Sequence, residues 1–111
     1  MSFEEWTPVI PEADLPLERA VSVTAGDVEL FLYRGADRIF ALQDRCTHQG
    51  GPLHRGPVNA DSARPTVTCP VHGSMFWLID GRVVRGPASR PQPAYDARIS
   101  DGMVEVRAQP D

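Results

Sequence analysis

The sequence has no run of apolar residues close to the roughly 20 that a helix needs to cross a bilayer. Its first residues are acidic and contain no apolar stretch like that of a secretory signal peptide. Acidic residues outnumber basic ones by 15 to 11, and the net charge of −4 argues against nucleic acid or an anionic membrane as a partner. We therefore expect a cytoplasmic protein that binds neither nucleic acid nor membranes.

Nucleotide-binding signatures and spare cysteines are also missing. The sequence contains no Gly-x-Gly-x-x-Gly turn, so the chain is not expected to take hydride from a nicotinamide by itself. It contains two cysteines. If both bind a metal, none is left for a disulfide, which suits a reducing compartment.

Proline and glycine, in contrast, are plentiful, with 11 and 9 residues in a chain of 111. Such a content is unfavourable for long helices and typical of short strands joined by turns. Residues 28–33 are the strongest strand candidate, because they are rich in β-forming side chains and apolar at 28, 30 and 32. Further strands are expected at 6–10, 20–24, 38–43, 66–68, 75–78, 83–84, 95–99 and 103–106.

These elements predict an all-β fold, an antiparallel sandwich or partial barrel of about nine or ten short strands. The length of the chain suits a single domain over residues 1–111. The proline within residues 6–10 marks that segment as an edge strand. Residues 54–65 are polar and are expected to be irregular.

The chemistry of the sequence is concentrated in two short segments. Cys46 is followed by His48, and Cys69 by His72, and both segments continue into glycine. From such a tight turn both side chains can reach one small object, and the glycines permit backbone conformations that other residues resist. Thiolate sulfur suits zinc, copper(I) and iron–sulfur clusters, whereas imidazole suits zinc, copper and iron.

Two metal centres fit this donor set, a structural zinc ion and an iron–sulfur cluster with mixed ligands. Zinc sites commonly group like ligands, as Cys-x2–4-Cys and His-x3–5-His pairs. Here each segment supplies one cysteine and one histidine, which favours a cluster held by two of each. In the remaining alternative, the thiols are buried structural residues and the histidines are unrelated to them.

The two segments resemble the ligand loops of the Rieske family of [2Fe–2S] proteins. The likeness continues in residues 50–53, in residues 72–76 and in the Gly-Pro-Ala of residues 86–88, which is similar to the proline loop that covers the cluster. The resemblance implies one Rieske-type [2Fe–2S] cluster. It also implies a Rieske-like fold in which a small cluster-binding subdomain, about residues 44–86, is inserted into a larger base.

The resemblance further implies a role for each donor. By the pattern of the family, Cys46 and Cys69 hold one iron, while His48 and His72 hold the other. Ser74 matches a serine that hydrogen-bonds a cluster sulfur in that family.

Other positions that bear on the reduction potential depart from this pattern. Phe76 stands where a tyrosine would add a second hydrogen bond to the cluster. Gly51 and Val71 stand where Rieske proteins of respiratory and photosynthetic complexes carry a disulfide between the loops. Because hydrogen bonds to sulfur stabilise the reduced cluster, we expect a potential in the lower part of the roughly −150 to +300 mV Rieske range.

Within the family, the chain is similar to the Rieske-type ferredoxins of ring-hydroxylating dioxygenase systems. This likeness implies a one-electron carrier and not an enzyme. Such a carrier docks transiently with a flavin-dependent NAD(P)H reductase and with a terminal oxygenase. Only His54 remains once two histidines bind the cluster, so the two-His-one-carboxylate iron site of the oxygenases cannot be built. The alternatives are the small subunit of an assimilatory nitrite reductase and a zinc-stabilised interaction module.

The surface around the histidines is expected to be a small apolar docking face. Its predicted members are the glycines of the two loops together with Pro52, Leu53 and Pro87, and weak redox encounters need little buried area. His54 is expected to be a solvated loop histidine.

Overall fold

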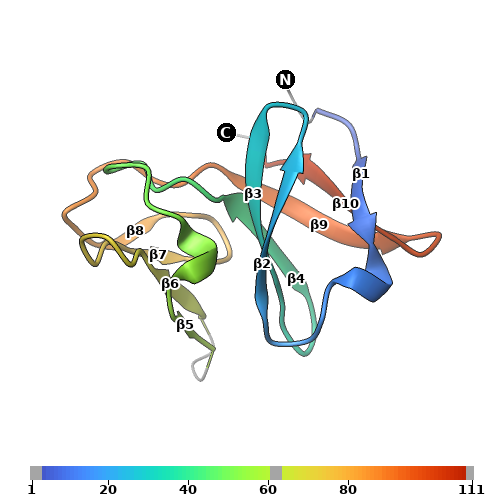
Figure 1. Ribbon diagram of the computed structural model, residues 1–111, viewed down its shortest axis with the longest axis horizontal. Helices are drawn as coiled ribbons and strands as arrows, with labels where there is room; N and C mark the ends of the chain where they lie inside the picture. Colours follow the sequence, from blue (N-terminus) through green and yellow to red (C-terminus); the bar gives the residue numbers. More distant parts are fainter. Residues whose placement is uncertain (1–3, 61–63, 110–111) are drawn as a thin grey trace.

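The computed structural model describes residues 4–60 and 64–109 of the chain. These residues form ten strands and two short 3₁₀ helices, and the named strands pair antiparallel throughout (Figure 1), which confirms the predicted all-β class. In the described ranges, no helix is long and apolar enough to cross a membrane. The elements are β1 (Thr7–Pro11), η1 (Glu12–Asp14), β2 (Ala20–Ala25), β3 (Val28–Arg34), β4 (Ile39–Gln43), η2 (Leu53–Arg55), β5 (Val58–Asn59), β6 (Thr66–Thr68), β7 (Met75–Trp77), β8 (Val83–Arg85), β9 (Ala94–Ser100) and β10 (Met103–Ala108).

The larger sheet has six strands in the order β1-β10-β9-β4-β3-β2. β1 contains Pro8 and Pro11, which cannot donate to a ladder, and it lies at the edge of the sheet, as the sequence predicts. The β9–β10 hairpin turns through Asp101 and Gly102, whose φ angles of 52° and 77° are left-handed, as a tight Asp-Gly hairpin turn requires. This sheet forms the base on which the second sheet rests.

The smaller sheet has four strands in the order β5-β6-β7-β8, and the chain enters it after β4 and leaves it before β9 (Figure 1). The prediction of irregular chain over residues 54–65 is only partly correct. This segment includes η2, and β5 pairs with β6 through Val58 opposite Val67. Residues 61–63 of the segment lie outside the described part of the chain.

Strands β3 and β4 are buried on both faces, whereas the sequence pattern of β3 indicated one apolar face. Leu30 and Leu32 pack into a core within the base, and Phe31 and Tyr33 pack on the opposite face into a second core. The second core lies between the two sheets and contains both cysteines. The base therefore packs β3 and β4 against the segments that carry both cysteines.

Candidate metal centre

The first donor loop spans residues 46–51 and is closed at both ends by main-chain hydrogen bonds. The Cys46 N–H donates to the Gly51 carbonyl at 2.9 Å, and the Gly50 N–H donates to the Cys46 carbonyl at 2.7 Å. Gly50 has a φ of +74°, and a Cβ at this position would meet no atom within 4 Å. The backbone conformation, and not the available space, is what favours glycine here.

The second donor loop, residues 69–74, repeats this hydrogen-bond plan. The Cys69 N–H donates to the Ser74 carbonyl at 2.7 Å, and the Gly73 N–H donates to the Cys69 carbonyl at 3.1 Å. Gly73 has a φ of +81°, again with no atom near a built Cβ. The two loops thus present their cysteine and histidine side chains from equivalent turns, as the repeated sequence motif predicts.

The two cysteines lie side by side in the core. Cys46 is 4% exposed and Cys69 is 3% exposed, and their thiols hydrogen-bond each other. Burial raises the pKa of the Cys46 thiol, and the neighbouring Cys69 raises it further. The backbone N–H groups of His48 and Gln49 donate to the Cys46 sulfur and oppose that rise in pKa. They would also stabilise a metal-bound thiolate.

The two histidines lie together at the exposed end of the loops. The ring centroids of His48 and His72 are 5.2 Å apart, and the rings meet edge to face at 81°. The His72 Nε2 is 2.7 Å from the Gln49 Oε1, a bond between the two loops that the sequence did not indicate. Because an amide oxygen only accepts, Nε2 is the donor in this bond, and Nδ1 is the ring nitrogen of His72 that could bind a metal.

A third loop covers the second donor loop. The Ala88 N–H donates to the Ser74 Oγ at 2.9 Å, and both residues are buried. With its oxygen used as an acceptor, the Ser74 hydroxyl still has its own proton to donate. The Gly-Pro-Ala segment therefore meets the second loop, where the family resemblance places it.

The third histidine does not have the solvated environment that we expected. The Asp44 carboxylate, 1% exposed, accepts a bond from the His54 N–H at 2.7 Å, and its other oxygen lies 2.7 Å from the His54 Nδ1. The Asp44 carbonyl accepts the Leu53 N–H at 2.9 Å. This pair of a buried carboxylate and a half-buried histidine joins the chain before the first donor loop to η2 after it, and lies outside the four-donor set.

Removing the Asp44 carboxylate is expected to destabilise the fold. Asp44→Ala should lower the free energy of unfolding by about 1–3 kcal/mol, because it leaves a partly buried N–H of His54 without a partner. Asp44→Asn should cost less, since its amide oxygen can still accept that bond. Chemical denaturation of both variants measures the difference. Equal stabilities for the alanine and wild-type proteins would contradict this role.

Leu53 was wrongly predicted to lie on the docking face. Leu53 is 0% exposed and belongs to the core, because it begins η2 and turns inward. Pro52 is half-buried and Pro87 is exposed. Val71, in the second donor loop, is 47% exposed and adds the apolar surface that Leu53 does not provide.

The donors fit a two-iron cluster. Such a centre with mixed ligands takes two sulfurs on one iron and two ring nitrogens on the other. The loops supply a buried cysteine pair and an exposed histidine pair. Among the described residues, no three His, Cys, Asp or Glu side chains gather as a site for one metal ion. Fold and donor set are those of an iron–sulfur protein.

Comparison with known proteins identifies the family. The chain belongs to the Rieske [2Fe-2S] domain family, whose match spans residues 5–96. Membership implies one Rieske-type [2Fe–2S] cluster, a group for which the donor set is chemically suited.

Relatives and solved structures agree with this family. The chain is 29% identical over 105 residues to the anthranilate 1,2-dioxygenase ferredoxin subunit of Burkholderia cepacia, which covers 95% of this chain and 94% of that one. It matches a chain of the complex of reduced oxygenase and oxidized ferredoxin in carbazole 1,9a-dioxygenase, with a TM-score of 0.81, 25% identity and coverage of 97% and 99%. A putative nitrite reductase NADPH (small subunit) oxidoreductase protein matches with a TM-score of 0.81 at 18% identity, covering 94% and 99% of the two chains, and shows the fold alone.

Proposed function

We propose that this protein is the ferredoxin component of an oxygenase system, a one-electron carrier in which Cys46 and Cys69 bind one iron while His48 and His72 bind the other. The observation that carries the proposal is the arrangement of the four side chains: two equivalent loops hold the cysteines in the core and the histidines at the surface. When bound, the cluster supplies reversible one-electron storage. The chain holds it, shields its sulfur side and leaves its histidine side accessible.

The carrier role follows from the chemistry of the site and from the relatives. The histidines form the exposed end of the loops, and half-buried or exposed apolar residues, Pro52, Val71 and Pro87, are available beside them for a transient contact. One relative is named as a dioxygenase ferredoxin subunit, and one matched structure is a complex of an oxygenase with a ferredoxin. A terminal oxygenase is therefore the proposed electron acceptor.

We further propose a flavin-dependent NAD(P)H reductase as the electron donor and the cytoplasm as the compartment. We treat the chain as one domain in which about residues 44–86 form the cluster-binding part. The likeness to a nitrite reductase subunit is one of fold, and the relative that covers 95% of this chain is a ferredoxin subunit. The zinc alternative does not agree with membership of a [2Fe-2S] family.

An electron-relay assay tests the function. Purified protein is mixed with NADH and a flavoprotein reductase of an aromatic-ring dioxygenase system, and cytochrome c serves as the final acceptor. Reduction of cytochrome c should depend on added holoprotein and saturate with it, and protein stripped of iron should give no increase. A rate that is independent of the holoprotein would contradict the carrier role.

Ser74 is expected to tune the potential. Its hydroxyl oxygen accepts the Ala88 N–H, so its proton is available to a cluster sulfur. Ser74→Ala should lower the midpoint potential by on the order of 60 mV, equivalent to one hydrogen bond that is stronger by about 1.4 kcal/mol in the reduced state. Redox titration measures the shift, and Ser22→Ala, exposed on β2, is the control. An unchanged midpoint in Ser74→Ala would contradict this role.

A further inference from the structure

Gln92 is a buried amide in the segment between β8 and β9. Its side chain is fully enclosed, with 1% exposure, although prolines on both sides place it in a loop. A buried amide is costly unless its donors and acceptor are all used. The partners of Gln92 therefore indicate what this residue does.

Within the described part of the chain, the Gln92 side chain forms three hydrogen bonds, and all of them go to the main chain around Cys46. Its Nε2 donates to the Gln43 carbonyl at 2.7 Å and to the Arg45 carbonyl at 2.9 Å. Its Oε1 accepts the Thr47 N–H at 2.6 Å. One amide thus bonds alternate residues on both sides of the first cysteine, and it lies 45 residues or more from each of them in the sequence.

The bond to Thr47 determines where the next N–H groups point. Gln92 takes the Thr47 N–H, the next two N–H groups donate to the Cys46 sulfur, and the Gly50 N–H donates to the Cys46 carbonyl. Four successive N–H groups of the first donor loop therefore have defined acceptors. Without the Gln92 oxygen, the Thr47 N–H loses its acceptor, and the peptide planes that aim two N–H groups at sulfur lose one of the hydrogen bonds that orient them. The main-chain bonds that close the loop and the bond from the Thr47 hydroxyl to the Arg90 carbonyl would remain.

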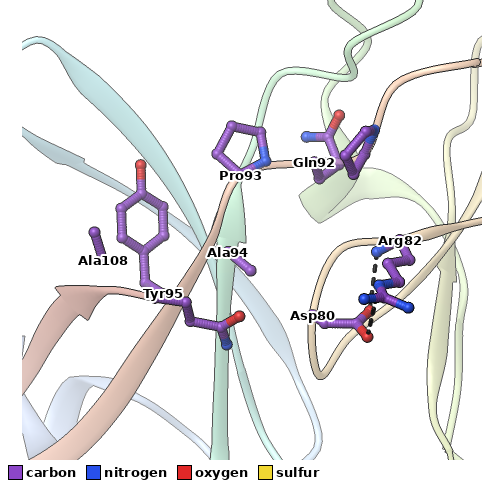
Figure 2. A pocket seen from close by; sticks show the side chains of 9 residues that line it. Asp80, Arg82, Gln92, Pro93, Ala94, Tyr95 and Ala108 are labelled. Carbon is purple, nitrogen blue, oxygen red and sulfur yellow. Dashed lines mark hydrogen bonds and ion pairs between the residues drawn. The ribbon is translucent and has the colours of Figure 1, made fainter. Parts of the chain in front are cut away.

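Gln92 is itself held firmly from the opposite side. Its N–H donates to the Gly81 carbonyl at 2.8 Å, and a Cβ on Gly81 would lie 2.0 Å from the Gln92 carbonyl oxygen. Gln92 is among the residues that line a cleft of about 460 Å³. Figure 2 shows Asp80 and Arg82 of the β7–β8 hairpin on one side of this cleft and Tyr95 of β9 on the other, with Gln92 above them. The residue therefore stands where the base, the small sheet and the first donor loop meet.

We infer that Gln92 is a positioning residue for the cluster, acting through the backbone of the first donor loop. It fixes the N–H groups that donate to the sulfur of Cys46, so it controls both cluster retention and the reduction potential. Bonds from N–H groups to a cluster sulfur stabilise the reduced form, so weakening them lowers the midpoint potential. This inference rests on the ligand set proposed above.

The test replaces the amide by a side chain of similar size that forms no hydrogen bonds. Gln92→Leu should bleach about 10–100-fold faster than wild type in the presence of an iron chelator, the range typical of residues that orient metal ligands. Its midpoint potential should also be lower than that of wild type. The matched control is Gln109→Leu, which removes an amide bond to the Ile79 carbonyl at 2.9 Å, a partner that lies outside both donor loops. The control should bleach and titrate as wild type does.

Two further measurements keep the outcomes distinct. Gln92→Asn keeps an amide on a shorter side chain and should give intermediate bleaching rates and potentials, which decides the matter if the leucine variant does not fold. Wild-type protein without a [2Fe–2S] spectrum would overturn the ligand proposal itself. If Gln92→Asn and Gln92→Leu both kept the midpoint potential and the bleaching rate of wild type, the positioning role alone would be overturned. A variant that lost unfolding stability but kept its potential would overturn it as well.

Discussion

Replacing His72 by glutamine is expected to give a folded protein that has lost its cluster. The His72 side chain is exposed and bonds Gln49 at the tip, so its loss removes little from the core. It does remove one of the two proposed nitrogen donors, an effect on metal binding at least as large as the roughly 10–100-fold cost of losing a residue that merely orients a ligand. Iron and sulfide content and the visible spectrum measure the loss, and circular dichroism measures the fold.

The chain contains a matched control for this experiment. His54 is the third histidine, and its ring contacts the Asp44 carboxylate instead of the other two histidines. His54→Gln should therefore keep its iron and its colour, although it loses some stability with the Asp44 bond. If His72→Gln kept full iron, or if both variants lost it equally, the proposed ligand set would be wrong.

Adding one methyl group at Gly51 is expected to disturb the cluster from the cysteine side. A Cβ built on Gly51 lies 2.7 Å from the Cys69 sulfur and 2.5 Å from the Val71 Cγ2. Val71 is exposed and can turn away, whereas the Cys69 thiol is enclosed by the core. Gly51→Ala should therefore displace the sulfur, lose most of the bound iron and cost about 1–3 kcal/mol of stability through overpacking.

Two companion variants separate these effects. Gly51→Ala combined with Val71→Ala removes the contact with the valine Cγ2 but not the contact with the sulfur, so it should still lose iron. Gly35→Ala is the control, because its Cβ would meet neighbours only at ordinary distances of 3.4 and 3.5 Å. Full iron content in Gly51→Ala would show that the Cys69 sulfur tolerates the added methyl group. The prediction that a side chain at position 51 displaces the Cys69 sulfur would then be wrong.

The built Cβ of Gly51 also lies 3.2 Å from the Cβ of Val71. Disulfide-bonded residues have their Cβ atoms about 3.5–4.5 Å apart, so the two positions face each other at nearly that spacing. The resemblance placed a loop-to-loop disulfide at these positions in some relatives. Here they carry a glycine and a valine, and main-chain and side-chain hydrogen bonds hold the loops.

Sequence patterns between neighbouring residues predict the strands and the two Cys–His segments well. Period-two apolar residues and Asp-Gly turns depend on neighbours in the chain, so they located β2, β3, β9 and β10 closely. The two Cys–His segments could be recognised because each keeps a cysteine and a histidine within four residues. The structure folds both segments into loops with the same hydrogen bonds.

Features that depend on distant residues escaped the sequence analysis. β3 is buried on both faces because the second sheet packs on the face that carries Phe31 and Tyr33. No sequence pattern within β3 predicts that contact. Leu53 turns inward with η2, and its apolar neighbours come from other segments of the chain. Asp44 and Gln92 are polar residues in polar or proline-rich surroundings, and only the partners of their side chains, 10 to 49 residues away, explain their burial.

The proposed ligand set can be tested by magnetic resonance of the dithionite-reduced protein labelled with ¹⁵N-histidine, together with iron and sulfide analysis. The account predicts two irons and two sulfides per chain and hyperfine coupling to the nitrogens of two histidines. The coupling to one histidine should vanish in His48→Gln and in His72→Gln if any cluster remains, and should persist in His54→Gln. A single metal ion without sulfide, or a reduced cluster without histidine coupling, would contradict it.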